Sequence, residues 1–171
     1  MMRITLMILA VGSLLFCTAC QADQSANTEE TVEEVDLKTA LQGTWQTFQI
    51  NVAINTADGR DTFRTESLTE EVWEDVFKME PPVYYFQPDQ KYRLVHRNIL
   101  GELVNQSRGM WNTFGDTLVL IEPEVTYQYE VKLANGRAAF RAFMDWDADG
   151  EEDDEYQGLQ RQISISAEEE Q

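Results

Sequence analysis

The sequence is poor in the residues that thiol chemistry and soft-metal sites require. Its two cysteines, Cys17 and Cys20, lie close to the N-terminus, and its single histidine is His96. The chain beyond Cys20 therefore offers no disulfide, no thiol nucleophile and no thiolate ligand for zinc. A serine–histidine triad would have to use His96, and no serine stands in a Gly-x-Ser-x-Gly setting. These absences predict that the protein is not an enzyme.

Basic residues are also scarce. The chain has 13 Lys and Arg against 31 Asp and Glu, which gives a formal net charge of −18. Such a charge repels nucleic acid and the surface of an anionic bilayer, so we expect neither to bind the folded body, and cations are the partners it favours. The sequence gives no indication of a protein partner. The length and the ordinary apolar content fit one domain with a hydrophobic core.

The N-terminus has the pattern of a secretory signal. Arg3 supplies positive charge, Leu6–Phe16 is an apolar run too short to span a bilayer, and two small residues precede Cys20. This ending resembles the lipobox of bacterial lipoproteins, in which the cysteine is acylated. The resemblance implies a signal peptide over residues 1–19 and a lipid on Cys20. That lipid would hold the protein in the cell envelope, where we expect the outer membrane on its periplasmic or surface side. The alternative is an ordinary cleaved signal peptide.

The rest of the chain divides by composition. Residues 20–35 are acidic and almost free of apolar side chains, which predicts a flexible tether. Residues 36–166 form the predicted domain, and residues 167–171 an acidic tail. Within the domain we expect a short helix at 36–41 and a second helix opening at Ser67, with apolar residues at helical spacing up to Met79.

Alternating apolar and polar residues, separated by turn signals such as Asn135-Gly136, predict a meander of short antiparallel strands. In the first strand we expect Phe48, Ile50, Val52 and Ile54 on one face. The predicted strands are 43–54, 62–64, 83–87, 91–97, 103–105, 109–114, 117–122, 126–133, 137–144 and 155–166. This pattern favours an all-β barrel or sandwich of about eight to ten strands.

Gly43-Thr44-Trp45, at the start of the first strand and after a helical turn, resembles the opening motif of lipocalins. Later features follow the order found in lipocalin-like domains of small bacterial lipoproteins, namely Tyr84-Tyr-Phe-Gln-Pro-Asp89, Gly109-Met-Trp111 and Gly115-Asp-Thr-Leu118. The resemblance implies an antiparallel up-and-down barrel. It also implies that Trp45 plugs the closed end and that a basic residue of the last strand, Arg161, packs across it.

Two functional classes follow from such a barrel. In the first, the interior binds a small apolar or amphipathic molecule. The candidate lining residues are Tyr84, Phe86, Tyr92, Trp111, Tyr127, Tyr129, Phe140 and Phe143. In the second, the barrel is filled by its own side chains and the protein has a structural or adhesive role. An open cavity would favour the first class and a packed interior the second.

The segment 145–154 is the clearest chemical motif. Asp145, Asp147 and Asp149 alternate, Gly150 permits a sharp turn, and Asp153 follows within reach of the same ion. Hard cations such as Ca²⁺ take six to eight oxygen ligands, which carboxylates supply. The alternative is a solvated acidic turn.

The position of this segment between two predicted strands excludes a helix–loop–helix calcium site. Tyr156 also stands at the twelfth position, where an EF-hand needs glutamate. The spacing resembles the Asp-x-Asp-x-Asp-Gly-x-x-Asp calcium loops of β-propeller repeats. That resemblance implies side-chain ligands from Asp145, Asp147, Asp149 and Asp153 and a backbone carbonyl ligand from Glu151. We therefore expect a structural Ca²⁺ ion in a late hairpin loop.

Overall fold

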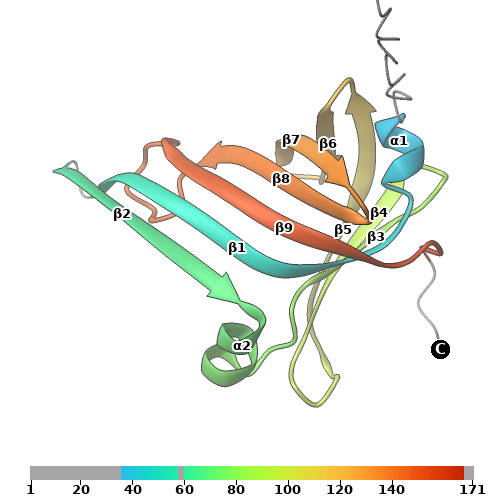
Figure 1. Cartoon of the computed structure of the whole chain (residues 1–171), viewed down its shortest axis with the longest axis horizontal. Helices are drawn as coiled ribbons and strands as arrows, with labels where there is room; N and C mark the ends of the chain where they lie inside the picture. The colour runs from blue at the N-terminus through green and yellow to red at the C-terminus, as the bar shows by residue number, and fades with distance from the viewer. Residues whose placement is uncertain (1–35, 58–59, 168–171) are drawn as a thin grey trace, which may run out of the picture. The chain divides into compact units, whose positions relative to one another are not determined.

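The computed structural model describes residues 36–57 and 60–167 (Figure 1). The predicted signal peptide, Cys20 and the tether up to residue 35 lie outside these ranges, as does nearly all of the predicted acidic tail. The described residues form nine strands and three short helical elements. None of these helices is long and apolar enough to cross a bilayer.

Eight of the nine strands close into an antiparallel barrel. Consecutive strands from β3 to β9 pair in chain order, β3 pairs with β1, and β9 returns to pair with β1. β2 is an additional strand on β1. The prediction of an all-β antiparallel barrel of eight to ten strands is confirmed. The strands are β1 Gly43–Ala57, β2 Arg60–Thr69, β3 Val83–Phe86, β4 Lys91–Arg97, β5 Leu103–Phe114, β6 Thr117–Ile121, β7 Thr126–Ala134, β8 Arg137–Met144 and β9 Asp154–Ser164.

The long strand β1 has two partners on one edge and one on the other. Its first residues pair with β3, at Gln46 and Val83, and its later residues pair with β2, at Gln49 and Thr69. β9 follows the opposite edge of β1 over both halves. β2 and β3 therefore follow one another along the same edge of β1, separated in the sequence by the segment 70–82, and only β3 pairs onward with β4.

That inserted segment contains the helical turns α2 (Glu70–Val72) and η1 (Trp73–Phe77). The helix predicted between the early strands is present, but it begins later than its capping pattern indicated. Ser67 lies within β2, where its hydroxyl donates to Asn51 of β1 at 3.0 Å, so the sheet takes the residue expected to cap the helix. Trp73 is buried, whereas Phe77 is 50% exposed.

The helix α1 (Leu37–Ala40) precedes β1 and is capped by Asp36, whose carboxylate accepts from the backbone N–H of Lys38 at 3.2 Å. The indole N–H of Trp45 donates to the carbonyl of Leu41 at 2.8 Å. Leu37, Leu41 and Trp45 all belong to the buried core cluster. Trp45 is thus hydrogen-bonded to the C-cap residue of the helix that precedes the barrel.

Arg161 has partners other than the one expected. Its guanidinium donates to Gln46 and to Glu70, and the residue opposite Trp45 on β9 is Gln162. Because successive residues of a strand point to opposite faces, Arg161 shares the outer face with Gln46 and lies away from Trp45. The expected packing of Arg161 across Trp45 is therefore corrected to an outer-face contact between β9, β1 and the start of α2.

A register shift in β1 changes its inward face. The pairing of β1 with β9 shifts between Thr47 and Gln49, which is the signature of a β-bulge. As a result Thr47 is buried, and the guanidinium carbon of Arg137 lies 5.4 Å from the centre of the Phe48 ring. The expectation that Phe48 shares a face with Ile50 was wrong, because the extra residue resets the alternation.

Candidate metal site and barrel interior

Aromatic side chains fill the barrel interior. Six of the eight predicted lining residues belong to the buried core cluster: Tyr84, Phe86, Tyr92, Trp111, Tyr129 and Phe140. Their rings contact one another, with the Phe86 centroid 5.2 Å from Trp111 and 6.4 Å from Phe140. Side chains packed at these distances leave the middle of the barrel occupied by the protein itself.

The tyrosines inside the barrel are neutral hydrogen-bond donors. Burial, followed by the Glu122 carboxylate, raises the pKa of Tyr92 far above its ordinary value, and the Tyr92 hydroxyl donates to Glu122 at 2.5 Å. Burial is also the first cause that raises the pKa of Tyr84, Tyr129 and Tyr156. The interior phenols are therefore uncharged, and no phenolate forms there near neutral pH.

The other two predicted lining residues lie at the surface. Tyr127 is 39% exposed and Phe143 is 68% exposed. Together with Tyr129 and Met144 they border a hollow of about 450 Å³ next to the loop between β8 and β9. The aromatic residues proposed as one lining thus divide between a packed core and the rim of an open hollow.

The loop between β8 and β9 is wound by hydrogen bonds from its own backbone. The Asp145 carboxylate accepts from the N–H of Asp149 at 3.0 Å and of Gly150 at 3.1 Å. Asp149 accepts from the N–H of Glu151 at 3.0 Å. Ala148 and Gly150 have positive φ angles of 62° and 96°, which turn the chain back on itself. These bonds hold the carboxylates in place without any ion.

Three predicted ligands converge in this loop. One carboxylate oxygen from each of Asp145, Asp147 and Asp149 lies within 4.8 Å of the others. The hydroxyl of Thr56 links Asp153 to this cluster, because it lies 3.3 Å from Asp149 Oδ2 and 3.2 Å from Asp153 Oδ2. The structure thus brings together the aspartates that the spacing indicated.

The loop is anchored to the barrel by Asp154, the first residue of β9, which is 1% exposed. Its carboxylate accepts from the backbone N–H of Trp146 at 2.8 Å and of Asn55 at 3.3 Å. The Asn55 side chain in turn donates to the carbonyl of Asp153 at 2.5 Å. One buried carboxylate therefore ties both ends of the loop to the end of β1.

The carboxylates of the loop repel one another. Burial first, and then repulsion from Asp149 and Asp154, raise the pKa of Asp147 above its ordinary value. Oδ1 of Asp147 and Oδ1 of Asp153 are both enclosed and lack a hydrogen-bond partner within the described structure. A cation among these oxygens would neutralise the repulsion and satisfy both atoms.

Three residues of this site were not identified from the sequence as part of it. Thr56 and Asn55 lie almost 100 positions before the loop, and they reach it only because β1 and β9 pair to close the barrel. Asp154 ends the acidic segment 145–154 and is not among the ligands that the spacing predicts. Nothing in the local pattern distinguishes a buried anchoring carboxylate from an exposed one.

Comparisons of the chain with protein-family models, curated proteins and solved structures found no match.

Proposed function

We propose that this is a lipid-anchored, non-enzymatic protein of the cell envelope, with a lipocalin-like barrel whose last hairpin is stabilised by Ca²⁺. The observation that carries the proposal is the convergence of Asp145, Asp147 and Asp149, with enclosed and unpartnered oxygens at Asp147 and Asp153. The lipid anchor rests on the sequence pattern that ends at Cys20.

The distances suit a hard divalent cation. Ligand oxygens about 2.4 Å from a calcium ion lie no more than about 4.8 Å from one another, and the three carboxylate oxygens all fall within that limit. The carboxylate of Asp153 and the carbonyl of Glu151 would raise the set to five, and water would complete it. Calcium is favoured over magnesium because an irregular, carboxylate-rich loop tolerates its variable geometry.

The packed interior supports a structural or adhesive role. Phe86, Trp111 and Phe140 occupy the space that an interior ligand would need, and each is at most 1% exposed. In such a protein the ion would stabilise a domain that has no disulfide, at the point where the first and last strands meet.

A second candidate function is binding of a small apolar or amphipathic molecule at the hollow of about 450 Å³ beside the loop. The observation in its favour is the exposure of Tyr127 and Phe143 at the rim. Native mass spectrometry of protein purified from its own cells tests it. A lipid or other apolar molecule that co-purifies without a covalent bond supports this candidate, and protein with only the mass of the acylated polypeptide contradicts it.

Calcium binding is tested by thermal unfolding of the protein in a chelator and in saturating Ca²⁺. At a free calcium concentration about 100 times the dissociation constant, the ion adds about 2.7 kcal/mol of stability. This corresponds to a rise of roughly 10 °C in the midpoint for a domain of this size. Asp147→Asn should abolish the rise.

The matched control is Glu152→Gln, which removes an exposed carboxylate from the same loop outside the cluster. It should keep the wild-type response to calcium. Equal midpoints of the wild-type protein with and without calcium would remove the ion from the proposal. Equal responses of Asp147→Asn and the wild type would place any ion elsewhere.

A further inference from the structure

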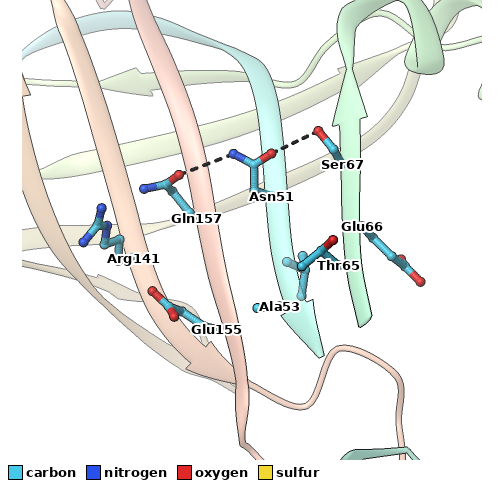
Figure 2. Close-up of a pocket in the computed structure, with 9 residues that line it drawn as sticks. Asn51, Ala53, Thr65, Glu66, Ser67, Arg141, Glu155 and Gln157 are labelled. Carbon is cyan, nitrogen blue, oxygen red and sulfur yellow. Dashed lines mark hydrogen bonds between the residues drawn. The ribbon is translucent and has the colours of Figure 1, made fainter. Parts of the chain in front are cut away.

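We propose that the outer face of strands β8, β9, β1 and β2 binds a neutral oligosaccharide. This face carries a groove of about 500 Å³, formed by side chains that point away from the barrel interior. None of its nine lining residues belongs to the loop between β8 and β9; they comprise two amides, two hydroxyls, two glutamates, one arginine and the apolar Ala53 and Val52. Figure 2 shows these side chains arranged across the four strands.

A ladder of polar side chains crosses the groove. Asn51 of β1 is central: its amide nitrogen donates to Gln157 of β9 at 3.3 Å, and its oxygen accepts from Ser67 of β2 at 3.0 Å (Figure 2). Arg141 of β8 pairs with Gln157 and extends the row to a fourth strand. Pairing of the strands places these four residues side by side, because directly opposed residues share a face.

The ladder has more donors than it can satisfy. In one orientation the Gln157 amide oxygen accepts from Asn51, and Gln157 then has no acceptor for Arg141. If the amide is rotated by 180°, the same oxygen lies 3.0 Å from both Nε and Nη2 of Arg141. The Gln157 oxygen can therefore accept from Asn51 or from Arg141, but not from both in the same orientation. No carboxylate among the described residues lies within 4.0 Å of the Arg141 guanidinium. A guanidinium has five N–H donors and Gln157 can accept at most two of them, so the other N–H groups of Arg141 can donate to an oxygen of a ligand.

The space beside the ladder exists because the next residue on this face of β1 is small. Ala53 is flanked by Glu155 of β9 and Thr65 of β2, its directly paired neighbours. Because Ala53 has only a methyl group, a hollow remains between the carboxylate of Glu155 and the hydroxyl of Thr65, as Figure 2 shows. Polar groups thus converge on the hollow from three sides.

Two exposed phenylalanines border this polar face. Phe143 is two residues beyond Arg141 on β8 and is 68% exposed, and Phe63 is two residues before Thr65 on β2 and is 72% exposed. Phe143 is paired with Glu155, so it lies on the face of the groove, whereas Phe63 lies next to a register shift in the pairing of β1 with β2. Three strand spacings separate β8 from β2, or about 14 Å across the sheet. An oligosaccharide of a few units spans such a distance and can lay an apolar ring face on the phenyl group of Phe143.

The charges favour a neutral ligand. The groove holds one arginine, Arg141, and two glutamates, Glu66 and Glu155, and the whole chain has a formal charge of −18, so both the groove and the chain oppose an anionic ligand. Amides and hydroxyls donate and accept at once, which matches sugar hydroxyls that do the same. Aromatic rings beside a few placed polar groups are the usual composition of a small-molecule site.

The test is binding of the full chain to a printed panel of neutral oligosaccharides that covers common hexose and N-acetylhexosamine linkages, in the presence of a chelator. A sugar that binds is then titrated by NMR against three variants. Ala53→Phe should fill the hollow, and Asn51→Ala should remove the centre of the ladder; each should weaken binding about tenfold or more. Asn112→Ala, on the outer face of β5, should bind as the wild type does.

Binding to no member of the panel would overturn the proposal. Binding that survives both Ala53→Phe and Asn51→Ala would place the sugar elsewhere and would also overturn it. Binding that requires Ca²⁺ and is lost in Asp147→Asn would assign the sugar to the acidic loop instead. Because Asn51 and Ala53 face outward, their variants should unfold close to the wild-type midpoint; if Ala53→Phe does not fold, Asn51→Ala alone decides.

Discussion

Replacing Asp154 by alanine should destabilise the protein even when no calcium is present. The Asp154 carboxylate is 1% exposed and accepts from two backbone N–H groups, at 2.8 Å from Trp146 and 3.3 Å from Asn55. A hydrogen bond to a charged group contributes about 1.5–3 kcal/mol, and the longer bond belongs at the low end. Some repulsion on Asp147 is relieved at the same time. The expected net loss is about 3 kcal/mol.

The measurement is urea unfolding of the wild type and the variant in a chelator, followed by tryptophan fluorescence. A loss of about 3 kcal/mol lies within the stability of an ordinary domain, so the variant should still fold. Asp154→Asn keeps one acceptor oxygen and should lose roughly half as much. Glu152→Gln, in the exposed part of the loop, should stay within about 0.5 kcal/mol of the wild type. A loss for Asp154→Ala no larger than that of Glu152→Gln would refute the anchoring role.

Three further outcomes are expected. In Gly109→Ala the new methyl group would overlap the backbone carbonyl of Ile121 and the ring of Tyr92. The free energy of unfolding should therefore fall by about 1–3 kcal/mol. An unchanged urea midpoint would contradict this packing. Burial lowers the pKa of His96 below its ordinary value of 6.5, so its contribution to stability is present above about pH 6.5 and is lost as the pH falls through the lowered pKa. NMR titration of the protein without a histidine tag follows this single imidazole, and a midpoint at or above 6.5 would count against its burial. Cys20→Ser should move the protein from the membrane fraction to the soluble fraction and remove the acyl mass, whereas unchanged partition would contradict a lipid on Cys20.

Most strands could be predicted because each carries its own local pattern. The hairpin of β7 and β8 follows from Asn135-Gly136, where both residues have positive φ angles that a tight turn requires. The long strand β5 was expected as two pieces, 103–105 and 109–114. Its middle contains Gly109, which weakens a strand pattern but here permits the close approach of Tyr92. Pairing with β4 over the whole stretch makes it continuous.

The errors have a common physical origin. The bulge at Phe48, the strand ending at Thr69 and the outer position of Arg161 all depend on which neighbour each strand pairs with. A shift of one residue exchanges the two faces of a strand. The local sequence contains no signal for such a shift, because the partner lies far along the chain.

The sequence by itself determined the chemistry of this protein: an acidic chain without thiols after Cys20, a β-meander, and alternating aspartates before Gly150. These properties depend on residue type and short spacing, which the chain carries locally. Tertiary structure alone decided that the predicted aromatic lining is largely a packed core and that Thr56, Asn55 and Asp154 complete the loop. It also decided that Asn51, Ala53, Arg141 and Gln157 form one groove. Closure of the barrel joins strands from opposite ends of the domain, and contacts between distant segments exist only after that closure.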